Sequence, residues 1–158
     1  MPKFSRRTAF QASGALALIA MAGTAEGHEH GPELTAAEKA NLKLVEGYLK
    51  ASEDPKADMA ALIRQYMAPD ARVRFSQDLP MLSGQDKIIE AMKGFSAKGE
   101  RYEMKIVRSL VKGPMVVNDR LDSTFYPDGR KVGPAPVVGV FLIKDGKIQE
   151  WFDFVAKA

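Results

Sequence analysis

Apolar residues in the middle of the chain recur at helical spacing. Leu42, Val45 and Leu49 lie three or four positions apart, which places them on one face of a helix. Thr35 is a suitable N-cap for that helix, and Glu38, three residues further on, completes a capping box. The spacing predicts three helices, over about 36–52, 57–66 and 85–95.

From Arg101 onward, the pattern changes to one that indicates strands. Asp145 and Gly146 are a strong signal for a two-residue hairpin turn between the last two strands. Helices followed by an antiparallel meander of strands predict an α+β domain, and about 130 residues are enough to bury a core. The predicted strands cover about 72–76, 102–111, 115–125, 136–143 and 147–155.

The first 25 residues have the pattern of an export signal. Arg6 and Arg7 stand within a Ser-Arg-Arg-x-x-Phe core, and a short apolar run over 12–22 leads to small residues. This core resembles a twin-arginine signal, so a periplasmic location is expected. The alternative is an amphipathic or transmembrane helix, but the apolar run is shorter than the ~20 residues needed to span a bilayer. The exported protein is therefore not expected to remain inserted in the membrane.

Composition and charge exclude several classes of function. The 158-residue chain has a formal net charge of +3, but the predicted signal holds three basic residues and no acidic one. The remainder is balanced, with 20 basic and 20 acidic residues, so a nucleic-acid partner is not expected. Because the chain has no cysteine, disulfides, Cys-zinc sites and thiol catalysis are excluded. It also has no glycine-rich nucleotide motif, so no cofactor is expected.

The two histidines of the chain, His28 and His30, lie in a short stretch over 26–34. A His-x-His pair can bind a metal ion. Because chain termini are usually unordered, a flexible, solvated mature N-terminus is expected instead. The domain itself is predicted over 35–158, and no metal site is expected in it.

The strand over 115–125 carries the most informative polar residues. Alternate side chains of a strand share a face, so Asn118, Arg120 and Asp122 point to the same side. That side is either exposed to solvent, as in many antiparallel sheets, or faces a pocket that a curved sheet encloses. In a pocket, Arg120 and Asp122 could form a charge-assisted hydrogen bond away from water.

A second carboxylate, Asp153, is predicted to lie near this pair. Counting back from a two-residue turn places Val138 opposite Asp153. If the strand of Val138 lies between its two neighbours in sequence, Asp153 is about two strand spacings, roughly 10 Å, from the strand of Arg120 and Asp122. Two carboxylates bridged by an arginine form an asymmetric acid/base pair, because the arginine lowers the pKa of one while burial raises the pKa of the other.

Four short segments together resemble a known family. They are Val116-Val-Asn-Asp-Arg-Leu-Asp122, Gly139-Val-Phe141, Asp145-Gly-Lys-Ile148 and Trp151-Phe-Asp-Phe154. Over about 36–155 the chain is similar to the limonene-1,2-epoxide hydrolase family, within the SnoaL-like, NTF2-like superfamily. The resemblance implies a cystatin-like cone, in which three N-terminal helices pack on a curved antiparallel sheet. It also implies a homodimer formed through the outer face of the sheet.

The same resemblance implies a reaction and a role for each charged residue. In the family, an Asp-Arg-Asp triad opens an epoxide to a diol in one step, with no metal or cofactor. Carried over to this chain, Asp153 is the base that activates water, and Asp122 is the acid that protonates the epoxide oxygen. Arg120 bridges and orients both carboxylates. The predicted function is therefore that of an epoxide hydrolase-like enzyme, a hydrolase of ether bonds that acts on a small apolar epoxide.

The family also holds its water with a tyrosine and an asparagine on the short strand before the apolar loop, and this chain has neither there. The stretch over 72–78 reads Arg-Val-Arg-Phe-Ser-Gln-Asp, so Ser76, Gln77 or Asp78 would have to bind the water. Limonene epoxide itself is therefore not the expected substrate. The residues predicted to form the pocket walls are Phe75, Leu79, Met81, Leu82, Met92, Phe95 and Phe141.

Two other functions stay open. An isomerase or cyclase of the SnoaL-like or ketosteroid-isomerase-like kind would use one carboxylate to remove a proton next to a carbonyl. A non-catalytic NTF2-like protein would only bind an apolar ligand. Because one fold hosts many functions, the residues of the site must decide between them.

Overall fold

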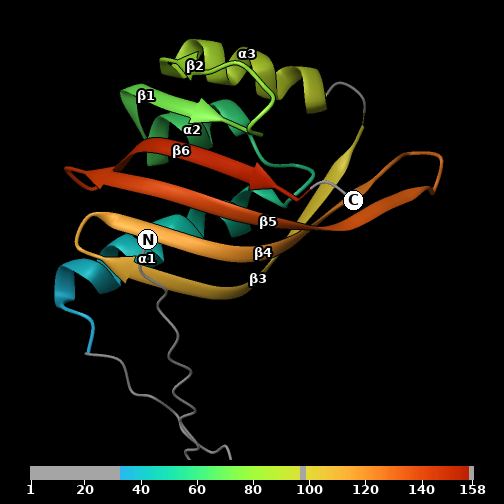
Figure 1. The fold of residues 1–158 in the computed structure, drawn as a ribbon. Helices are drawn as coiled ribbons and strands as arrows, with labels where there is room; N and C mark the ends of the chain where they lie inside the picture. Colours follow the sequence, from blue (N-terminus) through green and yellow to red (C-terminus); the bar gives the residue numbers. More distant parts are fainter. Residues whose placement is uncertain (1–32, 97–98, 157–158) are drawn as a thin grey trace, which may run out of the picture. The chain divides into compact units, whose positions relative to one another are not determined.

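The computed structural model describes residues 33–96 and 99–156. The export signal predicted over 1–25, as well as His28 and His30, lies outside these residues. The described part of the chain forms three helices and six strands (Figure 1). The helices are α1 (Ala36–Ser52), α2 (Met59–Tyr66) and α3 (Gln85–Ser96). The strands are β1 (Met67–Arg74), β2 (Leu82–Ser83), β3 (Arg101–Lys112), β4 (Met115–Phe125), β5 (Lys131–Lys144) and β6 (Lys147–Val155).

The six strands form one curved sheet in the order β2-β1-β6-β5-β4-β3. Helix α1 packs against β3 and β4, while α2 and α3 pack against β1, so the helices cover one face of the sheet (Figure 1). The core lies between this face and the helices, and includes Val45 of α1, Ile63 of α2, Ile88 of α3 and Trp151 of β6. Strands β4, β5 and β6 are neighbours in this order. Strand β4, which carries Asp122, and strand β6, which carries Asp153, therefore lie on either side of β5.

Several elements predicted from periodicity are confirmed. Helix α1 begins and ends as expected, and its capping box is present: the amide of Glu38 donates to Thr35 Oγ1 at 3.2 Å, and the amide of Thr35 donates to Glu38 Oε2 at 2.9 Å. Strands β4 and β6 also have the predicted bounds. None of the helices in the described ranges is long and apolar enough to cross a membrane.

The sheet is mixed, whereas the sequence predicted an antiparallel one. Strand β1 runs parallel to β6 and antiparallel to β2, and the other neighbouring pairs are antiparallel. The two members of the parallel pair are separated by most of the domain's length, so no turn between them could reveal their relative direction. Only the packing of the intervening helices and strands sets it.

Two strands begin earlier than predicted. Strand β1 starts at Met67, although Pro69 indicated a loop there. The hydrogen-bond ladder between β1 and β6 is irregular between Met67 and Arg72. A proline, which has no amide proton, can be accommodated at such an irregularity. Strand β5 starts at Lys131, because it continues beside β4 past an irregularity between Asp122 and Thr124.

Candidate active site

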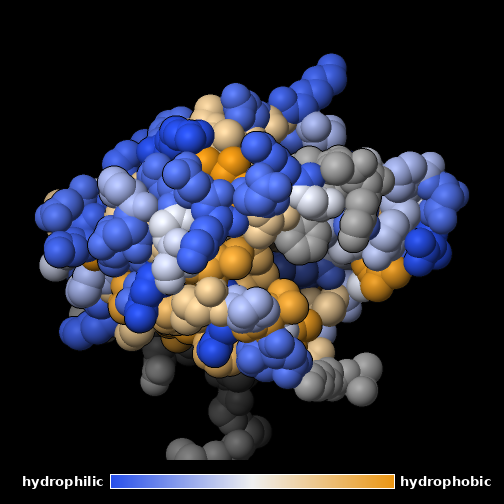
Figure 2. Space-filling model, turned by 90° about the horizontal axis from the view of Figure 1, so that it is seen from above, coloured by the Kyte–Doolittle hydropathy of each residue, from blue (hydrophilic) through white to orange (hydrophobic). Residues whose placement is uncertain are grey.

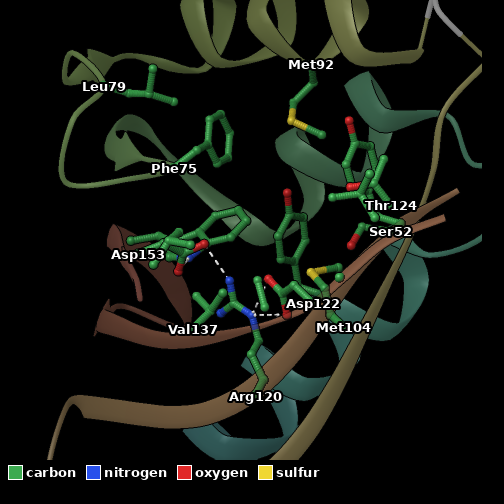
Figure 3. Close-up of a pocket in the computed structure, with 17 residues that line it drawn as sticks. Ser52, Phe75, Leu79, Met92, Met104, Arg120, Asp122, Thr124, Val137 and Asp153 are labelled. Atoms are coloured by element: carbon green, nitrogen blue, oxygen red, sulfur yellow. Dashed lines mark hydrogen bonds and ion pairs between the residues drawn. The ribbon is translucent and has the colours of Figure 1, made fainter. Parts of the chain in front are cut away.

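A cavity of about 350 Å³ lies between the helices and the sheet face that they cover. Side chains of α1, α3 and strands β3 to β6 line it, and most of them are apolar. Its charged members are Arg120, Asp122 and Asp153 (Figure 3). Leu79 and Val132 line the cavity and are about half exposed, at 47% and 51%, so they lie where it opens to solvent. Seen from the side of α3, the surface is mainly hydrophilic, with apolar side chains showing between the charged ones (Figure 2).

Arg120 is the centre of the site. Its side chain is 1% exposed and points from the middle of β4 toward the helices. This agrees with the second alternative from the sequence, in which this face of the strand lines a pocket. Its Nε donates to both carboxylate oxygens of Asp122 at 3.0 Å, and its Nη1 donates to Asn118 Oδ1 at 3.0 Å. Its Nη2 donates to Asp153 Oδ2. One guanidinium therefore joins two carboxylates from different strands, and the interpretation of this face as solvent-exposed is wrong.

Asp153 reaches the inner face because β6 contains an irregularity. Lys144 pairs with Lys147 as expected, but the ladder then skips one residue of β6, so Asp153 lies opposite Gly139 and not opposite Val138. Directly opposed residues share a face, and a shift of one residue moves a side chain to the other side of the sheet. Val138 is exposed on the outer face, so the predicted register would have placed Asp153 there as well. The bulge is therefore what brings the second carboxylate to Arg120.

The two carboxyls have different environments. Burial raises the pKa of Asp153 to about 6, although Arg120 and the indole of Trp151 partly offset this. The Trp151 indole Nε1 donates to Asp153 Oδ1 at 2.6 Å. Asp122 is more open, with 27% of its side chain exposed. Burial raises its pKa as well, the negative charge of Glu53 adds to this, and Arg120 lowers it.

The other predicted site residues are only partly brought together. Leu79, Phe75 and Met92 line the cavity with the triad (Figure 3). The side chain of Phe95 lies outside the described residues. Strand β1 ends at Arg74, two residues earlier than predicted, so the stretch that follows forms a turn near the surface. The predicted residues that do not line the cavity are Ser76, Asp78, Met81, Leu82 and Phe141.

Each of these residues has another place in the structure. Ser76 Oγ accepts a hydrogen bond from the amide of Asp78 at 3.4 Å, within the turn. Met81 is 40% exposed, and Leu82 packs against the hydrophobic core. Phe141 is fully buried behind the site, where its ring stacks on Trp151 at a centroid distance of 5.4 Å. None of these side chains lines the cavity, so their contact with substrate or water stays a prediction.

Three residues of the site were given no role in the sequence analysis. Asn118 was placed on the same face as Arg120, and the structure shows that it accepts a hydrogen bond from the guanidinium. Trp151 was given no role in the site, although it lies two positions before Asp153 on the same face, from where its indole reaches the carboxylate. Tyr48 of α1 lines the cavity and is 1% exposed; no local signal distinguishes it from an ordinary core residue.

The described residues offer no site for a metal ion. Within 33–96 and 99–156, no group of three or more histidine or acidic side chains converges. Asp122 and Asp153 are joined through the guanidinium between them, which offsets one of their two negative charges.

Comparison with known proteins identifies the family. Residues 39–157 match the model of the limonene-1,2-epoxide hydrolase catalytic domain, which covers the whole site. The chain belongs to this family. No curated protein matches the chain.

Solved structures agree with the fold of the limonene-1,2-epoxide hydrolase family and of its SnoaL-like and NTF2-like relatives. A limonene-1,2-epoxide hydrolase-like epoxide hydrolase from M. tuberculosis has a TM-score of 0.65 and 20% identity, over 75% of this chain and 84% of that one. A protein from Jannaschia sp. CCS1, described as a SnoaL-like polyketide cyclase, has a TM-score of 0.66 and 21% identity, over 79% and 91%. An NTF2-like protein of unknown function from Burkholderia pseudomallei K96243 has a TM-score of 0.62 and 15% identity, over 74% and 91%.

Proposed function

We propose that this protein is an epoxide hydrolase that adds water to a small apolar epoxide and releases a vicinal diol. The observation that carries the proposal is the Arg120 guanidinium, which is buried and hydrogen-bonded to Asp122 on one side and to Asp153 on the other. Opening an epoxide needs a base for the attacking water and an acid for the leaving oxygen. Two carboxyls held at fixed positions beside an apolar cavity supply both.

The reaction proceeds in one step. The carboxylate of Asp153 takes a proton from water while the water oxygen forms a bond to one epoxide carbon. The bond between that carbon and the epoxide oxygen breaks, and the electron pair stays on the oxygen, which takes the proton of Asp122. Arg120 holds both carboxyls in place and stabilises whichever is ionised. Asp153 then carries a proton and Asp122 has lost one, so transfer of one proton between them through water restores the starting state.

The pKa values define which protonation state reacts. In the free protein, burial raises the pKa of Asp153 to about 6, and burial also raises that of Asp122, which is more exposed. The proposed reaction needs one proton on the pair, carried by Asp122, while Asp153 is ionised.

The cavity defines the class of substrate. Apart from the triad, the walls near the reacting groups include Phe75, Leu79, Met92 and Val137 (Figure 3). A volume of about 350 Å³ is at the lower end for small-molecule sites, which are commonly about 300–1,000 Å³. The substrate is accordingly a small epoxide with apolar substituents.

One observation favours a second candidate function. Ser76 and Asp78, the residues predicted to bind water, do not line the cavity, so the carboxyl of Asp153 lies beside mainly apolar walls. A carboxylate in such a place could instead remove a proton next to a carbonyl, as in an isomerase or cyclase. A protein that binds an apolar ligand without reaction would use the same cavity.

The test is diol formation from a panel of small epoxides by the purified protein, beside the Asp153→Asn variant. Asp119→Asn is the matched control, because Asp119 lies on the same strand as Arg120 but is 45% exposed and 3.9 Å from Arg108. We expect the wild type and Asp119→Asn to form diol, and Asp153→Asn to form none. Absence of diol from every epoxide would reject the hydrolase and favour the isomerase or binding function.

We also propose that the protein is exported to the periplasm and forms a homodimer through the outer face of the sheet. The basis for export is the twin-arginine pattern at Arg6 and Arg7. The basis for the dimer is apolar surface on that face, where Val138 and Phe154 are paired across β5 and β6 and are 41% and 44% exposed.

A further inference from the structure

One end of the cavity carries a group of hydroxyl side chains. Tyr102 of β3 and Thr124 of β4 are directly opposite each other in the sheet, and both line the cavity. Ser52, the last residue of α1, lines it as well, and Figure 3 shows Ser52 and Thr124 on the side of the cavity where Asp122 lies. Because alternate residues of a strand share a face, Thr124 continues the inner face that carries Arg120 and Asp122. Ser52, Tyr102 and Thr124 are called the hydroxyl cluster below.

The end of α1 is attached to the sheet beside this cluster. Glu53, the C-cap of α1, accepts a hydrogen bond from the amide of Met104 at 2.7 Å. Met104 lies two positions after Tyr102 on β3, and both line the cavity. Ser52, which precedes Glu53, is therefore held over the same part of the sheet as the other two members of the cluster.

The opposite end of the cavity, on the side of Asp153, is mainly apolar. Val155 follows Asp153 on the same strand and lines the cavity. Phe75 and Tyr48 each meet the indole of Trp151 edge-on, with ring centroids 5.2 and 5.6 Å away, so this end consists mostly of ring surface, although Tyr48 adds a hydroxyl. The strand order β6-β5-β4-β3 thus runs from the apolar end to the hydroxyl cluster, with the two carboxyls between them.

The hydrogen bonds of the cluster favour a ligand hydroxyl over a ligand carbonyl. Ser52 Oγ donates to the carbonyl of Leu49 at 2.8 Å, and Tyr102 Oη donates to Glu100 Oε2 at 2.6 Å. Since their protons are engaged, these two oxygens can act toward a ligand only as acceptors, whereas Thr124 Oγ1 can donate or accept. A carbonyl only accepts and so suits Thr124 alone. A hydroxyl both donates and accepts, and suits every member of the cluster.

We propose that the substrate is an epoxide whose apolar chain ends in a hydroxyl group, and that the hydroxyl cluster binds this group. The inference rests on the proposed hydrolysis and narrows its substrate class to epoxy alcohols. Two residues along a strand span about 7 Å, which is the step from Asp122, the acid for the epoxide oxygen, to Thr124. The hydroxyl of the substrate therefore lies about 7 Å from the epoxide oxygen, about the length of an extended chain of five carbon atoms.

The kinetic test compares 5,6-epoxyhexan-1-ol with 1,2-epoxyhexane, which lacks only the hydroxyl. We expect the wild type to have the higher kcat/KM for the alcohol. In Thr124→Val, the ratio of the two kcat/KM values should fall roughly 10-fold, because the variant keeps the size of the side chain but loses a hydrogen bond to the ligand. A disturbance of the reacting groups affects both substrates alike and cancels in this ratio.

Ser109→Ala is the matched control for the loss of a hydroxyl. Ser109 lies on β3, like Tyr102, but its Oγ donates to Glu46 at 3.1 Å and it does not line the cavity. This variant should keep the wild-type ratio. An equal fall of the ratio in Ser109→Ala and Thr124→Val would overturn the assignment of the hydroxyl site to the cluster.

The second test does not depend on activity. The expected products, hexane-1,2,6-triol and hexane-1,2-diol, differ by the same hydroxyl, and calorimetry measures their affinities. We expect the ratio of the triol affinity to the diol affinity to fall roughly 10-fold from the wild type to Thr124→Val. If no epoxide is hydrolysed but this ratio falls, the hydroxyl site stands while the proposed function fails. If both epoxides are hydrolysed and neither ratio changes in Thr124→Val, this inference fails and the proposed function stands.

Discussion

The guanidinium of Arg120 occupies the space that a side chain at Gly139 would fill. Gly139 is paired with Asn118 on β4 and with Asp153 on β6, so it lies at the centre of the three strands that form the site. A Cβ added there would overlap Nη1 of Arg120 and would lie 2.6 Å from Asn118 Oδ1. The absence of a side chain on β5 is therefore what lets an arginine on one strand reach a carboxylate two strands away.

Gly139→Ala should disrupt the site. The methyl group must displace the guanidinium or the Asn118 side chain, and overpacking of this kind costs about 1–3 kcal/mol of the free energy of unfolding. Because Arg120 would also lose its position between the carboxyls, we expect diol formation to fall at least as steeply as stability. Urea unfolding and steady-state kinetics on the same preparation measure both effects.

Gly94→Ala is the control for this substitution. Gly94 lies in α3, and a Cβ there would meet no atom within 4 Å. Alanine has the higher helix propensity, so this variant should be as stable as the wild type or more stable by about 0.5–1 kcal/mol. Equal loss of stability in both variants would show that the space beside Arg120 is not the reason for Gly139.

The rate of hydrolysis should pass through a maximum at mildly acidic pH. The reaction needs one carboxyl ionised and the other protonated, and burial raises the pKa of Asp153 to about 6 and also raises that of Asp122. Above about pH 6 the pair loses its last proton, so kcat/KM should decline as the pH rises. At lower pH both carboxyls become protonated and the rate should decline again. A kcat/KM that stays constant between pH 6 and 9 would contradict this protonation scheme.

Asp122→Asn and Asp153→Asn should each abolish turnover without unfolding the protein. An asparagine keeps an oxygen that can accept from Arg120, and removing a buried negative charge offsets part of the lost ion pair. We therefore expect the melting temperature to fall by less than about 10 °C, on the order of 2 kcal/mol for a domain of this size. A larger fall, measured by circular dichroism, would show that the ion pairs are mainly structural.

The effect of Asp153 on stability should depend on pH in a definite direction. Its pKa is raised in the folded protein, to about 6, so folding favours its protonated form. The stability that this group contributes is fully present below its unfolded pKa, near 4, and is lost as the pH rises through about 6. Between pH 4 and 7 the wild type should therefore lose stability relative to Asp153→Asn. A difference that does not change with pH would contradict the raised pKa.

A charged residue on the outer face of the sheet should prevent dimer formation. Val138 and Phe154 are opposite each other on β5 and β6 and are both about two-fifths exposed. If a second copy covers them, Val138→Lys buries an unpaired charge in the interface and yields a monomer. Light scattering after size exclusion measures this. A monomeric wild type would reject the proposed dimer. Lys43→Glu, at an exposed position of α1 on the other side of the sheet, controls for a change of charge.

Much of the fold and two site residues, Arg120 and Asp122, could be predicted from local patterns, because those features depend on near neighbours. Helical spacing and a capping box located α1, alternation located β4 and β6, and alternation also placed Arg120 and Asp122 on one face. The α+β class follows from the order of such elements. The resemblance to the family then assigned Asp153 to the same site, and the structure brings all three side chains together.

Only the tertiary structure decided how these parts meet. The parallel pairing of β1 with β6, the bulge that turns Asp153 inward and the space beside Gly139 all depend on residues far apart in the chain. The same holds for Tyr48, which has the spacing of a core residue and faces the cavity only because α1 packs on β3 and β4. Local patterns specify which face of an element is apolar. Contacts between distant strands and helices determine what each polar group reaches, and that requires the packed fold.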